Sequence, residues 1–212
     1  GMSRGLGDVY KRQSLDSLEG KLGSAFSDAV DLLEGMSGTV VVCGMGKSGL
    51  VGAKITATLT STGTPSVFLH PAEAMHGDLG IVRKGDVIIL ISNSGETEEI
   101  TRLLPALKRL AVRIIALVGN VDSTMARAAD ICLDAAIDKE ACPLNLAPTT
   151  STLAALVLGD ALAVALMERR GFRPADFAAT HPGGKLGKKL LHTANCLLYT
   201  SDAADEVRSV YS

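Results

Sequence analysis

The sequence predicts an α/β fold, a three-layer αβα sandwich in which a five-stranded parallel sheet is covered by helices on both faces. Short runs of aliphatic residues alternate with longer segments whose apolar residues recur at helical spacing. The short runs are apolar at nearly every position, which is typical of parallel strands buried on both faces. The 212 residues contain no repeat or linker before residue 190, so we expect one domain.

The expected strands lie at five apolar runs, at residues 39–43, 65–69, 86–91, 112–118 and 131–133. Helical spacing of apolar residues predicts helices over residues 14–34, 47–61, 97–110, 124–129 and 149–170. Pro105 should bend or break the third of these helices, because proline has no backbone N–H to donate. The last helix is apolar over most of its surface, so we expect it to be buried in the fold or between subunits.

Composition and charge exclude several classes of protein. The formal net charge is −2, which gives no basic footprint for nucleic acid or an anionic membrane surface. No uninterrupted apolar run approaches the roughly 20 residues that span a bilayer. The cysteines are scattered without CxxC spacing, so neither a disulfide framework nor a zinc site is indicated, and we expect a reduced, cytoplasmic protein.

The two ends of the chain are expected to lie outside the domain, which we place at residues 14–195. Residues 1–13 and 196–212 do not continue the patterns beside them. The segments GLGDVYKRQ and CLLYTSDAADE resemble peptides translated from sequencing-adapter DNA. We interpret both ends as non-native tails, with two ordinary surface tails as the alternative.

Two glycine-rich loops follow the first and third expected strands, with the sequences GMGKSG and SNSGET. In a doubly wound sheet of order 2-1-3-4-5 these strands are neighbours, and ligands bind in the crevice at their carboxyl ends. Each loop leads into a helix N-terminus, where N–H groups favour an anion. The hydroxyls of Ser92, Ser94 and Thr97 surround Gly95, and Lys47 adds a positive charge. Together these groups suit a phosphate monoester.

Other interpretations of the loops are weaker. GMGKSG lacks the spacing of a P-loop. It matches the GxGxxG dinucleotide fingerprint, but His70 and Pro71 stand where the acidic residue of that fingerprint is expected. Tight turns and helix caps explain either loop alone. Their joint placement at the switch point of the sheet favours phosphate.

Five segments carry a resemblance to a known family: CGMGKSG, GTPSVFLHPAEAMHGDLG, ISNSGETEEI, KEACPLNLAPTTST and THPGGKLGKKLL. They closely resemble the sugar isomerase (SIS) domain of bacterial arabinose-5-phosphate isomerases, from about residue 15 to 192. The resemblance implies the SIS fold and interconversion of D-ribulose 5-phosphate and D-arabinose 5-phosphate for 3-deoxy-octulosonate, in lipopolysaccharide or capsule synthesis. It also implies a homotetramer with active sites at subunit contacts. Many members continue into a pair of CBS domains, which this sequence does not contain.

This isomerisation requires an anchored phosphate, acid–base help in ring opening, a base that moves a proton between C2 and C1, and a stabilised enediolate. The scheme requires no metal or organic cofactor. The expected partner is a small sugar phosphate, with no nucleic acid and no membrane. The phosphate-binding residues are expected to be Ser92, Ser94 and Thr97, with Asn93, Gly95 and Glu96 shaping the loop and Gly46 and Ser48 contributing.

The resemblance also suggests the catalytic residues. Lys47 would stabilise the enediolate or neutralise the phosphate. Glu140 would be the base, and Glu99 an orienting or second acid–base group, although acids in a first helical turn also favour the helix dipole. His181 would assist ring opening, with entry into a neighbouring subunit's site as one option. Which of Glu99, Glu140 and His181 moves which proton stays open.

Four further residues resemble substrate-contacting positions, namely Gly63, Thr64, His70 and His76. A buried, hydrogen-bonded histidine is the alternative for each imidazole. His70 and His76 could also bind a divalent metal, which would inhibit the enzyme. Two other functions remain open: a sugar-phosphate-sensing SIS module without turnover, and an isomerase of another phosphosugar.

Overall fold

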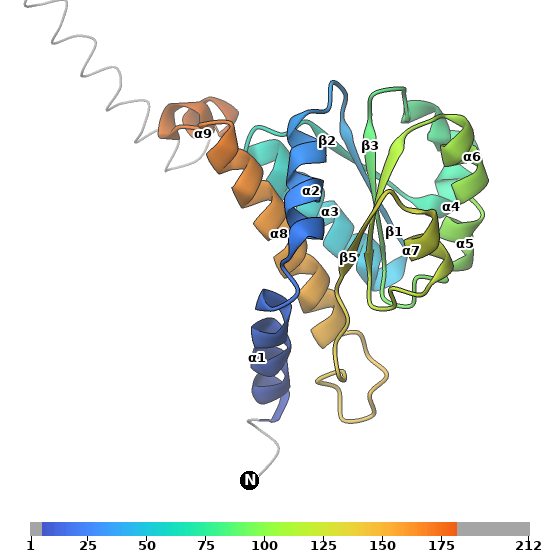
Figure 1. Ribbon diagram of the computed structural model, residues 1–212, viewed down its shortest axis with the longest axis vertical. Helices are drawn as coiled ribbons and strands as arrows, with labels where there is room; N and C mark the ends of the chain where they lie inside the picture. Colours follow the sequence, from blue (N-terminus) through green and yellow to red (C-terminus); the bar gives the residue numbers. More distant parts are fainter. Residues whose placement is uncertain (1–5, 182–212) are drawn as a thin grey trace, which may run out of the picture.

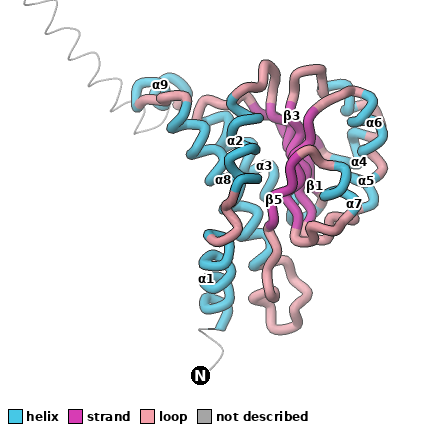
Figure 2. The backbone as a smooth tube through the Cα atoms, in the orientation of Figure 1, coloured by secondary structure: helices cyan, strands magenta, loops and turns pink. Residues whose placement is uncertain are grey.

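The computed structural model describes residues 6–181 and contains a five-stranded parallel sheet between two layers of helices (Figure 1 and Figure 2). The strands are β1 (Val40–Gly44), β2 (Ser66–Leu69), β3 (Val87–Ser92), β4 (Arg113–Val118) and β5 (Ile131–Asp134). Their order is β2-β1-β3-β4-β5, and each neighbouring pair is parallel. The predicted fold class and strand order are confirmed.

The sheet separates two hydrophobic cores, which explains the unbroken aliphatic runs. Along β1, Val40 and Val42 belong to the core beneath α2, α3 and α8. Val41 and Cys43 point to the opposite core, beneath α5, α6 and α7. Because successive side chains of a strand point to opposite faces, a strand covered on both sides needs an apolar residue at every position.

The helices agree with the prediction except in two respects. Their bounds are α1 (Leu6–Glu19), α2 (Ser24–Glu34), α3 (Gly46–Ser61), α4 (Pro71–Ala74), the 3-10 helix η1 (Asp78–Ile81), α5 (Glu98–Thr101), α6 (Leu104–Arg109), α7 (Thr124–Ala128), α8 (Thr150–Arg169) and α9 (Pro174–Thr180). The break at Pro105 is confirmed, and this proline lies in the first turn of α6. The single helix over 14–34 is wrong, because residues 20–23, with a glycine at each end, separate α1 from α2. The short helices α4, η1 and α9 were not predicted.

Helix α1 crosses residue 13, where we expected the N-terminal tail to end. Within it, Tyr10 packs against the segment after β5, with the Nζ of Lys139 3.7 Å from the centroid of its ring. Residues 196–212 of the expected C-terminal tail lie outside the described residues.

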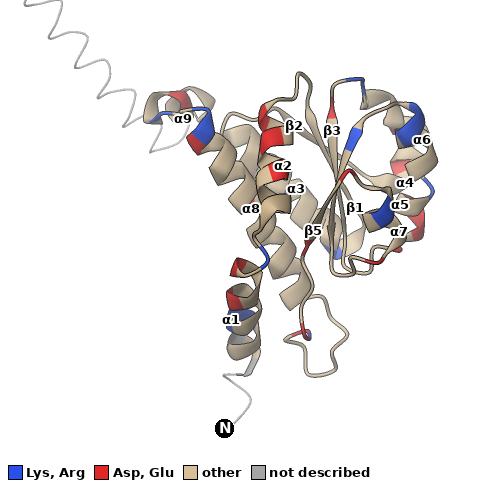
Figure 3. Ribbon diagram, in the orientation of Figure 1, with Lys and Arg blue, Asp and Glu red and all other residues tan. Residues whose placement is uncertain are grey.

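Helix α8 crosses the domain and packs against α3. Among the described helices it alone is long and apolar enough to cross a membrane, with a mean hydropathy of 1.8, but half of the tested window is buried. Figure 3 shows that α8 is mostly uncharged between its ends. Core helices have the same length and composition, and burial against α3 and the sheet accounts for the apolar sequence. We therefore assign α8 to the core.

The contact between α3 and α8 depends on Gly159. A Cβ at this position would lie 2.3 Å from the Cδ1 of Ile55 and 2.5 Å from its Cγ1. We expect Gly159→Ala to destabilise the domain by about 1–3 kcal/mol, because overpacking outweighs the gain in helix propensity. Urea unfolding measures this. Adding Ile55→Val should give less destabilisation than the sum of the single changes, whereas full additivity would contradict the close contact.

Candidate active site

The structure places the two glycine-rich loops side by side. Strands β1 and β3 pair with Gly44 opposite Ile91, so both loops leave the same edge of the sheet. The first loop turns into α3 at Gly46, whose φ of +57° lies in the left-handed region. The second loop leads from Ser92 into α5. Their junction is the switch point of the sheet, where doubly wound folds bind ligands.

The SNSGET loop is folded around its own hydroxyl groups. The Oγ of Ser92 lies 2.7 Å from the Oγ1 of Thr97 and 3.4 Å from the Oγ of Ser94. The backbone N–H of Gly95 donates to the Oγ of Ser92 over 3.0 Å. Gly95 has a φ of +67°, which a residue with a side chain rarely adopts. The turn thus gathers several hydroxyl groups within one short stretch of chain.

A cavity of about 290 Å³ joins the two loops to the segment before α8. Ser48 of the first loop and Asn93 of the second both line it. The remaining lining residues come from the irregular segment after β5 and the first turn of α8: Ile137, Asp138, Lys139, Glu140, Asn145, Leu146, Pro148 and Ser151. Ligand-binding cavities begin at about 300 Å³, so this volume suits a small molecule.

Glu140 stands at this cavity with its carboxylate bound to the N-terminus of α8. Its Oε2 accepts the N–H groups of Thr149 and Thr150, each over 2.7 Å, and the hydroxyl of Thr149 over 3.0 Å. Its Oε1 accepts the hydroxyl of Ser151. The Oδ1 of Asn145 accepts the N–H of Glu140 over 2.7 Å. The carboxylate therefore satisfies N–H groups that a helix start otherwise leaves unpaired.

These contacts set the protonation of Glu140. Burial acts to raise the pKa of its carboxyl, but the donors from Ser151, Thr149 and Thr150 outweigh burial and hold the pKa below its usual value of 4.5. Hydrogen bonds to the charged form have this effect. Glu140 is therefore ionised at neutral pH, in the form that can accept a proton. Some of these donors must weaken before it holds one.

The lowered pKa predicts a pH dependence of stability. A carboxyl whose pKa is lower in the folded state stabilises the protein above its unfolded value, here 4.5, and this contribution is lost as the pH falls through the folded value. We expect the free energy of unfolding of the wild type to fall more steeply below pH 4.5 than that of Glu140→Gln. Urea unfolding across this range measures it, and parallel curves for the two proteins would contradict the assignment.

Two other predicted catalytic residues lie near the same edge of the sheet. Lys47 is exposed in the first turn of α3, next to Ser48, and its side chain makes no hydrogen bond or ion pair with any described residue. Glu99 is half-buried in the first turn of α5, where its side chain likewise has no described partner. Neither is among the residues that line the cavity of about 290 Å³.

His70 and His76 lie on either side of α4, after β2. His70 is the N-cap residue of α4, and its Nδ1 is buried without a hydrogen-bond partner among the described residues. His76 is exposed. Within residues 6–181 no group of three or more His, Cys, Asp or Glu side chains could hold a metal ion. The metal-binding prediction for the two histidines is untested by this geometry, because it involves only a pair.

The other predicted residues lie at the far end of the domain within one chain. Gly63 and Thr64 precede β2 at the amino edge of the sheet, where Arg170 donates to the Oγ1 of Thr64 over 2.9 Å and to the carbonyl of Gly63 over 3.3 Å. His181 follows α9, and Figure 1 shows α9 at the opposite end of α8 from the segment after β5. Helix α8 has 20 residues and so spans about 30 Å. A single chain therefore does not bring these three residues to the cavity.

The sequence analysis missed several residues of the cavity, notably Asp138, Lys139, Asn145 and Ser151. One signal was present, because threonines and a serine directly before an apolar helix are typical of an N-terminus. Asn145 adopts a φ of +52°, which asparagine tolerates better than most residues. Its place in an irregular segment gave no periodic pattern that would have identified it.

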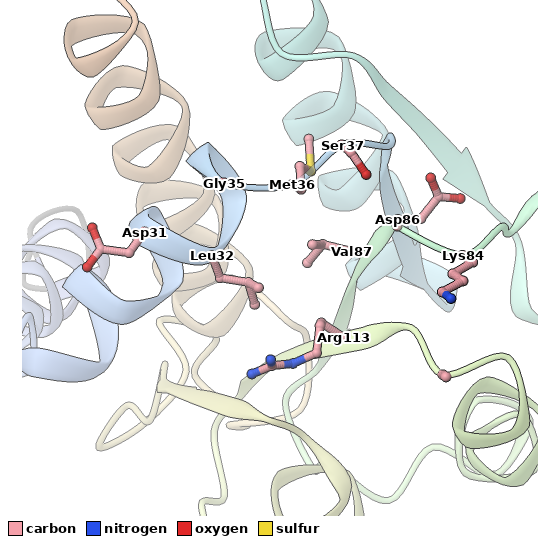
Figure 4. Close-up of a pocket in the computed structure, with 11 residues that line it drawn as sticks. Asp31, Leu32, Gly35, Met36, Ser37, Lys84, Asp86, Val87 and Arg113 are labelled. Carbon is pink, nitrogen blue, oxygen red and sulfur yellow. The ribbon is translucent and has the colours of Figure 1, made fainter.

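A larger cavity of about 660 Å³ lies at the amino edge of the sheet, away from the loops (Figure 4). Leu32, Met36 and Val87 provide its apolar surface. Its buried carboxylate is already occupied, because Asp86 accepts the N–H groups of Thr39 and Arg83 over 2.8 and 2.7 Å. We therefore place the candidate active site at the smaller cavity, where both loops meet.

The fold and this cavity define a doubly wound α/β domain with a ligand-sized cavity at the switch point of its sheet. The family model described as SIS domain matches residues 36–165, which is more than half of the chain. The chain belongs to the SIS domain family.

Known relatives and a solved structure refine this placement. The chain is 54% identical over 197 residues to a Pseudomonas aeruginosa protein named arabinose 5-phosphate isomerase KdsD, covering 93% of this chain and 60% of that protein. It is 54% identical over 204 residues to the protein of the same name from Escherichia coli K12, covering 96% and 62%. The chain thus spans about 60% of the length of these curated relatives. A solved structure of a protein from E. coli CFT073, in complex with arabinose 5-phosphate, is 43% identical, with a TM-score of 0.77, covering 82% of this chain and 94% of that one.

Proposed function

We propose that the domain is an aldose–ketose isomerase that interconverts D-ribulose 5-phosphate and D-arabinose 5-phosphate through an enediolate. The observation that carries the proposal is the cavity in which Ser48, Asn93 and Glu140 meet. It combines loops suited to a phosphate with a carboxylate suited to proton transfer. Two kinds of relative support the substrate: proteins 54% identical that are named for this reaction, and a solved structure 43% identical that holds arabinose 5-phosphate.

The phosphate end of the substrate is assigned to the second loop. Ser92, Ser94 and Thr97 offer hydroxyl donors, and the adjoining N-terminus of α5 favours negative charge. Ser48 and the turn at Gly46 approach from the first loop. Lys47 supplies a positive charge one residue from the cavity, where it can neutralise the phosphate or the developing enediolate.

The carbon end is assigned to Glu140, as the base that carries a proton between C2 and C1. It lines the cavity and is ionised, which are the two properties that a general base needs in its resting state. Glu99 does not line the cavity, so we assign it an orienting or second acid–base role. Substrate binding would have to draw the Glu140 carboxylate away from some of the α8 donors, which raises its basicity.

The assignments of His181, Gly63 and Thr64 require a second subunit. We propose a homotetramer in which these residues reach a neighbouring site. Support comes from the loop beside the cavity, where Leu144 and Leu146 are 75% and 77% exposed. Large apolar side chains that protrude in this way are typical of surfaces that contact another protein. We place the enzyme in the cytoplasm, on the route to 3-deoxy-octulosonate.

The test is to incubate the purified chain with D-ribulose 5-phosphate in D₂O and to follow the sugar phosphates by NMR. We expect D-arabinose 5-phosphate to form, with solvent deuterium at C2, because an enediolate exchanges its proton with a base. Tight binding without turnover would instead favour a sensing module. Turnover only of a hexulose or heptulose phosphate would favour an isomerase of another phosphosugar.

A further inference from the structure

We propose that Ser123 and Thr124, at the start of α7, are positioning residues that hold the SNSGET loop in its phosphate-binding shape. This inference rests on the proposed function and extends it to a helix outside the candidate active site. Neither residue lines the cavity at the two loops. They act through Gly95 and Glu96, which we call the clamp residues of the loop.

Glu96 makes the first contact of the clamp. Its Oε1 accepts the backbone N–H of Thr124 over 2.7 Å, across 28 residues of sequence. The hydrogen bonds from Thr124 hold the pKa of the Glu96 carboxyl below its usual value, so the side chain stays charged. A charged carboxylate inside a phosphate site would repel the ligand. Here it is bound to α7, so it can hold the loop from outside the site.

Gly95 makes the second contact. Its carbonyl accepts the N–H of Met125 over 3.1 Å. A Cβ on Gly95 would lie 2.0 Å from the Oγ of Ser123 and 2.4 Å from its Cβ. Ser123 is fully buried, and its Oγ in turn accepts the N–H of Ala126 over 3.3 Å. The first turn of α7 therefore closes directly on the glycine.

The clamp passes to the phosphate-binding groups through the backbone of the loop. The N–H of Gly95 donates to the Oγ of Ser92, and the N–H of Glu96 donates to the Oγ of Ser94 over 3.2 Å. Both serine hydroxyls thus take their positions from the residues that α7 holds. Loosening α7 should disorder these donors before the phosphate binds, which costs affinity more than it costs chemistry.

Proline at position 124 tests the clamp with little damage to the helix. Thr124 is the first residue of α7, where the N–H is not needed inside the helix and proline is favoured. Ser123 has φ and ψ of −76° and 165°, which is the conformation that a residue before proline prefers. Thr124→Pro therefore removes the N–H that Glu96 accepts while the helix can keep its course.

We expect Thr124→Pro and Glu96→Ala to raise KM for D-ribulose 5-phosphate and the inhibition constant of inorganic phosphate about tenfold, with kcat changed less than about threefold. Glu96→Gln keeps an oxygen that can accept the N–H, so it should restore most of the affinity. Glu98→Ala is the matched control, since Glu98 pairs only with exposed Arg102 in the described structure, and it should behave as the wild type.

Unchanged KM and unchanged phosphate inhibition in Thr124→Pro and Glu96→Ala would overturn the proposal. So would a fall in kcat and in melting temperature with no shift in KM, because that pattern means a structural role alone. Calorimetric titration with inorganic phosphate keeps the test independent of turnover. If the wild type binds phosphate without isomerising, the proposed function fails, and weaker phosphate binding by Thr124→Pro still supports the clamp.

Discussion

Glu140→Gln is expected to lower kcat for D-ribulose 5-phosphate by about three orders of magnitude while phosphate affinity stays within about threefold of the wild type. The amide cannot take a proton from carbon, yet it leaves the two glycine-rich loops unchanged. Steady-state kinetics with inorganic phosphate as a competitive inhibitor measures both effects. Glu168→Gln, at the opposite, exposed end of α8, is the matched control and should keep wild-type kinetics.

Glu140 also caps α8, so loss of activity must be separated from loss of structure. The Gln amide places an N–H₂ group against N–H donors that now meet a carboxylate oxygen, and we expect about 1–3 kcal/mol less stability. Circular dichroism at the assay temperature shows whether the variant is folded. Glu140→Ala with added formate gives a second readout, because a small carboxylate can replace a missing base. A Gln variant with wild-type kcat would remove Glu140 from the role of base.

Lys47→Ala is expected to lower kcat/KM by two to three orders of magnitude, about the effect of removing one group that stabilises developing negative charge. The lysine lies beside the cavity and makes no ion pair with a described residue, so its charge is not already neutralised there. Steady-state kinetics of the variant decides its role. A fall in kcat alone indicates the enediolate as its target, and a rise in KM together with weaker phosphate inhibition indicates the phosphate.

The matched control for Lys47 is Lys84, an exposed lysine at the opposite edge of the sheet. Lys84→Ala changes the net charge equally and should leave kcat/KM unchanged, which separates a local effect from a general one. Lys47→Arg should recover only part of the activity, because the planar guanidinium cannot replace a compact ammonium at a close contact. If Lys47→Ala retains more than about a third of the wild-type kcat/KM, Lys47 has no catalytic role.

The fold was predictable because its strands are buried on both faces. The run at residues 87–91 is apolar at every position, and this continuity is a local property of the sequence. The bend at Pro105 was equally local. The break between α1 and α2 was missed, because apolar residues keep a helical spacing across residues 20–23 even though the chain there is not helical. Helices of one turn, such as α4, are too short to show a period.

The candidate site was predictable where its groups are adjacent in sequence. SNSGET and GMGKSG could be recognised because each loop carries its own hydroxyls, glycines and helix start. The clamp between Glu96 and Thr124 could not, because it joins groups 28 residues apart. Likewise, the binding of Glu140 to the start of α8 depends on the path of residues 141–148, which have no regular period. Positions such as Gly63 and His181 depend on how subunits pack, which one chain does not specify.

The central claim is that the two loops form one phosphate site with Glu140 at its carbon end. A crystal structure of the protein with bound D-arabinose 5-phosphate tests this most directly. We predict phosphate oxygens at about 3 Å from the hydroxyls of Ser92, Ser94 and Thr97, with C1 and C2 beside the carboxylate of Glu140. A sugar phosphate seated instead at the amino edge of the sheet, between Lys84 and Arg113, would contradict the account.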